Sequence, residues 1–312
     1  MSKKKVFDQI AVGLVYDMQE AVYYSDPCPT MALSQSLVKV LLETSPRHAA
    51  LAHPWQATAE EEPPPYDKAM AIGSATHKLL LGRGKNVTVI YHDSFRKKDA
   101  QELRTEAIKQ GNIAILEKHM MIAEEIHTKI GSELVCSGFV PWLGKTEVAL
   151  FWREGDIWLR SLIDLIENGK PHYWDIKTTA GAAAPQGLSR KMADGGWHIQ
   201  AAFQERGLDV VDPQNAGRRK FFFVLIEQSP PFAHSVCRIP ESAMVIGRKQ
   251  VDQAVRIWAY CLKTGVWPSY PPQVHEPELP PWYESQWLAR EINEAASERR
   301  PSNNMLTDLS GG

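Results

Sequence analysis

The chain has 312 residues, of which 44% are apolar and 23% charged, which is ordinary for a globular protein and allows one large domain or two smaller ones. The formal net charge of −2 excludes a strongly basic protein that coats DNA. It is compatible with a nuclease in which an acidic metal site offsets a local basic groove. No run of about 18 apolar residues occurs, so no membrane span is expected.

The cysteines and the N-terminus indicate the compartment. Four cysteines, at positions 28, 136, 237 and 261, are too far apart for a CxxC zinc knuckle. The start, MSKKK, is basic, but Asp17 interrupts the apolar stretch after it and no small-residue cleavage site follows. We therefore expect a cytoplasmic protein with reduced thiols.

The first half of the chain shows helical periodicity. Apolar residues at helical spacing predict a helix over 31–45, which Pro46 should stop. The same pattern predicts a helix over 67–81, with Gly82 as its C-cap. This half should also contain an extended proline-rich loop over 54–66 and a mostly helical stretch over 99–131, interrupted near Gly111.

The pattern changes at residue 145. Three runs rich in β-branched and aromatic residues span 145–179, with Gly155 between the first two and Asn168-Gly169 between the last two. These runs predict an antiparallel three-stranded meander. A helix over 185–207, a strand buried on both faces over 218–228, a strand over 235–239 and a long helix over 241–265 should follow.

This order of elements predicts an α+β fold. Its central mixed sheet would contain the meander and a further strand, with helices on its faces and an N-terminal helical extension. We expect the extension to span 1–30, the main domain 31–275, and a C-terminal helix with a polar tail 276–312. The end of the tail, from residue 297, is polar enough to predict disorder.

Four residues of the meander form a candidate catalytic constellation. Asp175 and Lys177 are two apart on one strand, so their side chains should share a face of the sheet. The hairpin should bring Asp164 alongside, and Glu147 of the first strand can add a carboxylate. Clustered carboxylates favour a hard cation between them, Mg²⁺ or Mn²⁺, and a lysine beside it can assist the attacking water. A DxK pair on a strand is common, however, and does not by itself identify a nuclease.

The order of the motifs is more specific. Asp164, then Asp175-Ile-Lys177, then Gln200 on the next predicted helix, resemble the motif series of PD-(D/E)XK nucleases, and within them the RecB/RecE-like and lambda-type exonucleases. The resemblance covers about 31–271 and implies a restriction-endonuclease-like core. Three further segments are similar to the RecE type: Gly73-Ser-Ala-Thr-His77, Glu147-Val-Ala-Leu-Phe-Trp and Trp267-Pro-Ser-Tyr270.

The resemblance implies a role for each matching residue. Lys177 would be the catalytic lysine, and Gln200 would orient it or contact DNA. The metal ligands would be drawn from Asp164, Asp175, Glu147, His77 and Ile176. One position departs from the family, because Gln204 stands where a tyrosine is usual. From its helical context alone, His77 could equally be a core histidine.

Local positive charge must supply the affinity for DNA. The candidates are Arg190, Lys191, Arg218, Arg219 and Lys220, although such residues could equally be solvated surface charges. Trp197 could stack on DNA ends or could pack its helix on the sheet.

The activity implied by the resemblance is a Mg²⁺-dependent exonuclease that acts on the ends of double-stranded DNA and degrades the 5′ strand. Such relatives are often phage-encoded, act in the cytoplasm of a bacterial host, form closed ring-shaped homo-oligomers and work with a single-strand annealing protein. A restriction- or repair-type endonuclease and a catalytically silent DNA-binding module are the alternatives. No iron–sulfur cluster is expected, because Cys237 and Cys261 are too far apart for the cysteine cluster that the related iron–sulfur nucleases need.

Overall fold

The computed structural model describes residues 10–56 and 64–298. The chain divides into two compact units, residues 1–269 and residues 270–312. Part of the predicted proline-rich loop, 57–63, and the predicted polar tail from residue 299 lie outside the described residues. The boundaries predicted at residues 30 and 275 stay predictions.

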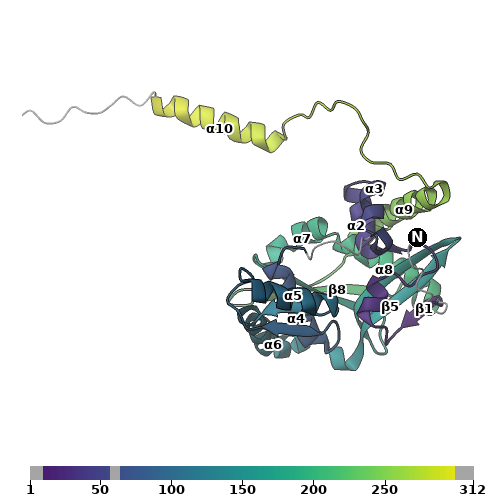
Figure 1. Ribbon diagram of the computed structural model, residues 1–312. Coiled ribbons are helices and arrows are strands. Elements are labelled where there is room, and N and C mark those ends of the chain that lie inside the picture. The colour runs from purple at the N-terminus through teal and green to yellow at the C-terminus, as the bar shows by residue number, and fades with distance from the viewer. Residues whose placement is uncertain (1–9, 57–63, 299–312) are drawn as a thin grey trace, which may run out of the picture. The chain divides into compact units, whose positions relative to one another are not determined.

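A mixed sheet forms the centre of the first unit (Figure 1). Its strands follow the order β1 (Gly13–Val15), β5 (Gly144–Glu154), β6 (Ile157–Glu167), β7 (His172–Thr179), β8 (Lys220–Glu227) and β9 (His234–Arg238), and β2 (Leu33–Ser34) pairs with β6 in parallel. The predicted meander is confirmed, because β5, β6 and β7 pair antiparallel in sequence order. The strand predicted over 218–228 is β8, which pairs parallel to β7 and brings Asp175 level with Phe223.

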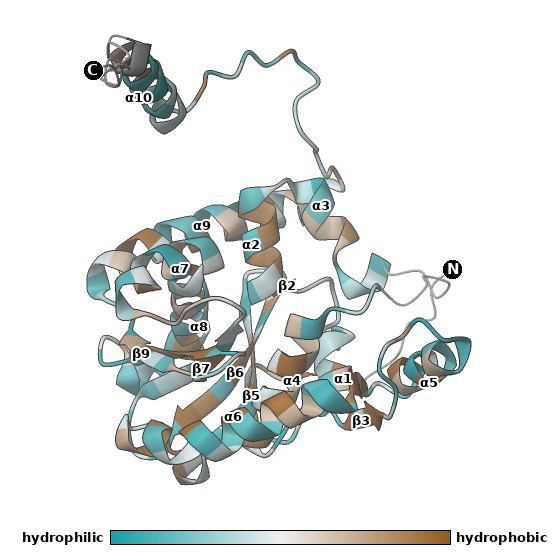
Figure 2. Cartoon of the chain, turned by 90° about the vertical axis from the view of Figure 1, so that its left-hand side faces the viewer, coloured by the Kyte–Doolittle hydropathy of each residue, from teal (hydrophilic) through white to brown (hydrophobic). Residues whose placement is uncertain are grey.

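Helices cover both faces of the sheet. Figure 2 shows α2 (Gln35–Glu43), α8 (Trp197–Val211) and α9 (Glu241–Thr264) on one face, and α4 (Lys68–Leu81) and α6 (Glu117–Cys136) on the other. Each face has its own apolar core: Trp152, Phe203 and Trp258 belong to the first, and Ile72, Ile130 and Ile176 to the second. The α+β class predicted from the sequence is therefore confirmed.

The N-terminal part of the chain joins this sheet as well as carrying helices. β1 pairs antiparallel with β5, and the short helix α1 (Glu20–Tyr24) follows it. The helix predicted over 31–45 begins later, because Ser34 caps α2 by accepting a hydrogen bond from the Leu37 N–H at 3.4 Å. Pro46 opens the next helix, α3 (Pro46–Leu51), at the position where a missing N–H costs least.

Two predicted helical stretches are interrupted. The stretch 99–131 contains α5 (Lys98–Lys109) and α6, with strand β4 (Ile113–Leu116) between them, which pairs parallel to β3 (Val87–Ile90). The helix predicted over 185–207 splits into α7 (Leu188–Gly195) and α8 at Gly196, whose φ of 66° ends the first helix in the left-handed region.

The second unit contains α10 (Pro281–Glu298). Among the helices that the structure describes, none is both long and apolar enough to cross a membrane.

Candidate active site

The site is built where β5 and β6 depart from regular strand geometry. The pairs Thr146 with Leu165 and Val148 with Ile163 place Glu147 opposite Asp164. Glu147 has a φ of 53°, a left-handed conformation that a non-glycine residue adopts at a cost of roughly 1 kcal/mol or more.

The faces of β6 also reverse across Asp164. Ile163 packs in the core beneath α8, whereas Leu165 packs in the core beneath α4 and α6. In a regular strand, residues two apart share a face. The distortion brings two buried carboxylates, those of Glu147 and Asp164, close to one another.

Asp164 also joins β6 to β7 through its side chain. Its Oδ2 accepts a hydrogen bond from the backbone N–H of Ile176 at 2.8 Å, just beyond the last backbone pair of the two strands, Leu165 with Trp174. The carboxylate therefore replaces a ladder partner, and it is held next to the Asp175–Lys177 segment.

Asp175 and Lys177 lie on one face of β7, as the two-residue spacing predicts. Lys177 Nζ lies 2.5 Å from Asp175 Oδ1 and donates a hydrogen bond to Gln200 Oε1 at 3.1 Å. The Gln200 amide in turn donates to Asp175 Oδ2. Gln200 of α8 thus contacts the lysine and the carboxylate together. Both oxygens of the buried Asp175 carboxylate therefore have a partner, Lys177 for Oδ1 and Gln200 for Oδ2.

His77 reaches the site from the opposite face, on α4. Its Nε2 lies 3.1 Å from Asp164 Oδ2 and 3.0 Å from the carbonyl oxygen of Ile176, and its Nδ1 lies 3.7 Å from Glu147 Oε1. We call His77, Glu147 and Asp164 the carboxylate cluster, and their ligand atoms lie within 4.8 Å of one another. From its helical context in the sequence, His77 could also have been a core residue. The structure instead places it beside the two carboxylates.

Close packing sets the position of α4. A Cβ atom on Gly73 would lie 2.7 Å from Thr178 Oγ1, so the helix can lie this close to β7 only with glycine there. Gln228, just after β8, donates hydrogen bonds to the Ala69 carbonyl at 2.7 Å and to Thr178 Oγ1 at 2.8 Å. Sequence reasoning missed Gln228, because its two partners lie far away in the sequence.

The ionisable side chains of the site shift one another's pKa values. Burial opposes the charged form of His77, but Asp164 and Glu147 outweigh it and hold the pKa of His77 well above its ordinary value. Burial would raise the pKa of Asp164, but His77 and Lys177 lower it overall. Burial raises the pKa values of Glu147 and Asp175, in both cases with a contribution from the charge on Asp164.

Burial would lower the pKa of Lys177, yet Asp175 and Asp164 raise it overall. The buried carboxylates therefore require positive charge beside them, and His77 and Lys177 supply it in this structure.

This donor set fits a divalent cation. One imidazole nitrogen and two carboxylates converge in the carboxylate cluster, and the Ile176 carbonyl lies at its edge. Oxygen donors with a single imidazole suit Mg²⁺ or Mn²⁺ better than soft metals. Asp175, predicted as a ligand, is held by Lys177 and Gln200 in this structure, outside the cluster of three.

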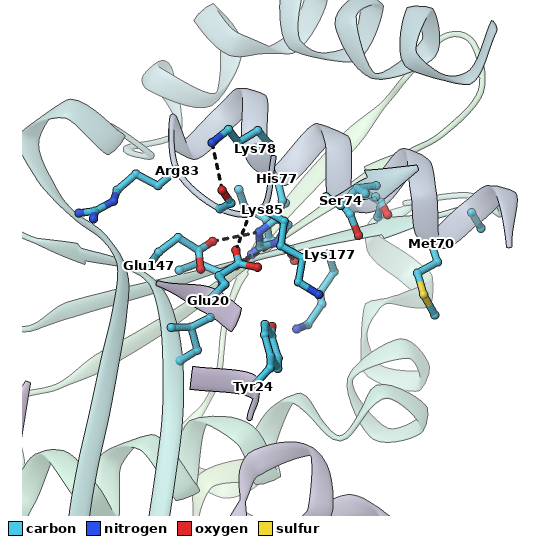
Figure 3. A pocket seen from close by; sticks show the side chains of 18 of the residues that line it. Glu20, Tyr24, Met70, Ser74, His77, Lys78, Arg83, Lys85, Glu147 and Lys177 are labelled. Carbon is cyan, nitrogen blue, oxygen red and sulfur yellow. Dashed lines mark hydrogen bonds and ion pairs between the residues drawn. The ribbon is translucent and has the colours of Figure 1, made fainter. Parts of the chain in front are cut away.

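The cluster opens onto a pocket of about 720 Å³. Figure 3 shows His77, Glu147 and Lys177 around it, with Glu20 and Tyr24 of α1 on the side facing His77. The loop after α4 contributes Arg83 and Lys85 to the wall. These four additional residues carried no local sequence signal, because they meet the site only through the fold.

Two of the predicted DNA-binding residues are buried. The Trp197 side chain stacks flat on Phe223, with ring centroids 5.2 Å apart, and the residue is 4% exposed, so it cannot stack on DNA in this conformation. The Arg219 side chain is 0% exposed and pairs with Asp209 and Asp212. Both expectations of a DNA contact are corrected, because these side chains hold α8 against the sheet.

The remaining basic candidates lie at opposite ends of β7 and β8. Lys220 pairs in register with His172 at the start of β7, and Arg218 precedes it in an exposed position. Lys191 donates a hydrogen bond to Thr179 Oγ1 at 3.2 Å, at the end of β7. Arg190, its neighbour, is exposed beside Asp194. The two basic patches are thus about 20 Å apart along the strands.

A family model agrees with this geometry. The model described as "PDDEXK-like domain of unknown function (DUF3799)" matches residues 34–275, which is more than half of the chain. The chain belongs to this PDDEXK-like family. The resemblance to PD-(D/E)XK nucleases inferred from Asp164, Asp175 and Lys177 is therefore confirmed.

The solved structures to which this chain is similar are distant in sequence. A candidate exonuclease from Eubacterium rectale superposes with a TM-score of 0.57 at 12% identity, over 85% of this chain and 97% of that chain. A phage-related exonuclease from Haemophilus somnus 129PT gives a TM-score of 0.34 at 11% identity, over 75% of this chain and 96% of that chain. No curated protein matches significantly. At this identity, the first likeness supports the fold.

The PDDEXK-like chain departs from the usual motif at Gln204, and the structure shows where this residue lies. Gln204 is buried, and its amide donates to the Leu162 carbonyl and to Gln35 Oε1, both at 3.3 Å. Ser161 donates to the same Gln35 oxygen. Gln204 therefore joins α8, α2 and β6, and Gln200, one turn earlier, is the residue of this helix that reaches the site.

Proposed function

We propose that the protein is a Mg²⁺-dependent exodeoxyribonuclease that hydrolyses phosphodiester bonds from the ends of linear double-stranded DNA. The observation that carries the proposal is the convergence of Glu147, Asp164 and Lys177 at the wall of an open pocket, with Asp175 paired to Lys177. Buried acids of this kind are costly without a cation. Membership of the PDDEXK-like family supports a nuclease.

The protein's own side chains would divide the work of hydrolysis. A Mg²⁺ ion held by His77, Glu147 and Asp164 would polarise the scissile phosphate and acidify a water molecule, and Asp175 would join these ligands only by leaving Lys177 and Gln200. Lys177, whose pKa is raised by Asp175 and Asp164 against the effect of burial, carries a proton in the free protein. It is therefore suited to donate hydrogen bonds and to offset the negative charge that grows in the transition state.

Gln200 would hold the Lys177 ammonium in the position that catalysis requires. Its Oε1 accepts from Lys177 Nζ while its amide donates to Asp175, and these two hydrogen bonds restrict the rotation of the ammonium. We infer that Gln200 is a positioning residue for Lys177.

The direction of degradation, 5′ to 3′ with 3′ single-stranded tails as products, belongs to the proposal and follows the resemblance to RecE-like exonucleases. So do an annealing protein as partner, a role in recombination and a closed homo-oligomer around the DNA. In such a ring, the exposed Arg218 and Lys220 or the patch of Arg190 and Lys191 could face the channel, and Arg219 could not.

The test uses the full chain with linear duplex DNA labelled at the 5′ or the 3′ end, and covalently closed circular DNA, each with Mg²⁺ or Mn²⁺. We expect the linear duplex to be degraded with early loss of the 5′ label, and the circle to survive. Rapid nicking of the circle would instead identify an endonuclease. Stable DNA binding without cleavage of any substrate would identify a silent binding module.

A further inference from the structure

The short helix α1 lines the pocket, although an isolated helix of its length would not be stable. It has five residues and no side-chain N-cap, whereas isolated helices need about 12–15 residues to form in water. Tertiary contacts must therefore hold it in place. Its last residue, Tyr24, is 50% exposed, lines the pocket and points toward the catalytic side chains (Figure 3).

A buried group of charged residues, the Asp26 cluster (Asp26, His53 and Arg160), anchors α1. Asp26 Oδ2 lies 2.8 Å from His53 Nε2 and accepts from the Ala32 N–H at 2.8 Å, and Asp26 Oδ1 lies 3.3 Å from Arg160 Nε. Arg160 donates to the Tyr23 carbonyl at 2.8 Å.

The guanidinium of Arg160 also lies over the Tyr23 ring, 4.7 Å from its centroid. Tyr23 is buried, and its ring meets the Tyr24 ring edge-on, with centroids 5.3 Å apart. The cluster thus fixes the residue next to Tyr24 and leaves Tyr24 itself facing the pocket.

A cation stands over the exposed aromatic ring. Lys85 Nζ lies 4.9 Å from the centroid of Tyr24, and the backbone N–H of Lys85 donates to Glu20 Oε1 at 3.0 Å, which ties the loop after α4 to α1. Lys85 is exposed and also lines the pocket.

A half-exposed aromatic ring beside a mobile ammonium suits a nucleotide. Rings of this kind stack on bases of any sequence, and a lysine contributes a salt-sensitive contact to phosphate. Burial, with the charges on Glu147 and Asp164 adding to it, raises the pKa of the Tyr24 hydroxyl, so the ring stays neutral beside the carboxylates.

We propose that Tyr24 and Lys85 form a subsite for one nucleotide of the DNA strand that is cut, in which the Tyr24 ring stacks on the base and Lys85 binds the adjoining phosphate. The ammonium leaves the ring when the base arrives. This inference rests on the proposed function, since it assumes that the strand enters the pocket.

The test measures the dissociation constant of the full chain for a short fluorescent duplex with a frayed end, with Ca²⁺ in place of Mg²⁺ to slow cleavage. Tyr24→Leu should weaken binding roughly tenfold, and Tyr24→Phe should bind nearly as well as the wild type. Lys85→Ala should lower the slope of log affinity against log salt by about one unit. Tyr91→Leu, an exposed tyrosine outside the pocket, is the matched control and should change nothing.

The outcomes separate this inference from the proposed function. Unchanged binding in Tyr24→Leu, or an equal loss in Tyr24→Phe, would overturn stacking on Tyr24. An unchanged salt slope in Lys85→Ala would overturn the phosphate contact. If the wild type binds DNA through Tyr24 but does not cleave it with Mg²⁺, the nuclease proposal fails and the subsite stands.

Discussion

Two buried groups of charged residues, the Asp26 cluster and the carboxylate cluster, are built from similar residue types but have different surroundings. In the Asp26 cluster, both oxygens of the aspartate accept backbone hydrogen bonds, and the Asp26 and His53 side chains are 0% exposed. In the carboxylate cluster, the His77 side chain is 28% exposed and lines a pocket together with Glu147 and Asp164.

The difference distinguishes a structural group from a functional one. The Asp26 cluster has its charges paired and closed off from solvent, which serves packing. The carboxylate cluster and the neighbouring Asp175 place three acids beside only two cations, His77 and Lys177, next to an open pocket. Displaced pKa values beside an open pocket, such as those of His77 and Glu147, are typical of sites that bind or react. Variants in the two groups should therefore affect different properties.

The largest expected effect is on activity. Asp175→Ala should abolish cleavage, because it removes a carboxylate from the metal site and releases Lys177, while the fold stays intact. The measurement is single-turnover cleavage together with circular dichroism. Asp156→Ala, in the exposed turn between β5 and β6, is the matched control. Cleavage by Asp175→Ala at a rate near that of the wild type would refute the assignment of the site.

In the Asp26 cluster the largest effect should be on stability. Asp26→Ala leaves Arg160 buried without its carboxylate, and breaking such a pair costs about 3–5 kcal/mol. Urea unfolding of the full chain measures this free energy. We also expect weaker DNA binding, because α1 loses its anchor. If activity fell while the free energy of unfolding stayed unchanged, Asp26 would belong with the catalytic residues. The contrast between the Asp26 cluster and the carboxylate cluster would then be wrong.

Lys177→Ala should lower kcat roughly 100- to 1000-fold, as is usual when a group that stabilises the transition state is removed. The KM for DNA should change little, because the ammonium acts mainly on the charge that develops during the reaction. Steady-state kinetics with Mg²⁺ present in excess separates the two constants. An effect confined to KM would make Lys177 a phosphate-binding residue.

The binding of Mg²⁺ should strengthen as the pH rises. Burial opposes a charge on His77, but Asp164 and Glu147 hold its pKa well above the ordinary value, so at neutral pH a proton occupies the imidazole that the metal needs. Raising the pH through this pKa removes the competitor. Isothermal titration calorimetry in buffers of different ionisation enthalpy should show proton release on binding. The absence of any released proton would argue against His77 as a ligand.

The smallest expected effect is a gain in stability. Burial raises the pKa of the Glu147 carboxyl, so its negative charge opposes folding. The free-energy cost of this charge grows as the pH rises from the pKa of Glu147 in the unfolded chain to its pKa in the folded protein. Glu147→Gln should therefore slightly raise the free energy of unfolding of the metal-free protein, while Mg²⁺ binding weakens. A marked loss of stability would show that Glu147 serves the fold.

Strand periodicity explains how much of the site could be predicted from the sequence. The positions of Asp175 and Lys177 follow from a period of two residues, and the hairpin after β6 brings Asp164 close to them. These are local rules, and they hold in the structure. The left-handed backbone of Glu147 and the hydrogen bonds of Gln228 to Ala69 and Thr178 arise from packing between distant segments. One sequence does not reveal such packing.

The two errors, at Arg219 and Trp197, have different origins. Arg219 belongs to a run of basic residues that resembles a surface patch, but Asp209 and Asp212 at the end of α8 bury it in ion pairs. Those acids lie within ten residues of Arg219, and their presence was a signal that could have been used. Trp197 precedes Gln200 on a helix, and only the tertiary fold shows that its ring covers Phe223.

The central claim is that the open group of acids is a metal-dependent catalytic site, and one measurement tests it most directly. The wild-type chain is incubated with an end-labelled linear duplex, either with Mg²⁺ or with an excess of chelator, beside Asp164→Asn under the same conditions. We predict progressive release of nucleotides only from the wild type with Mg²⁺. Equal degradation with the chelator present, or by the Asp164→Asn variant, would contradict the account.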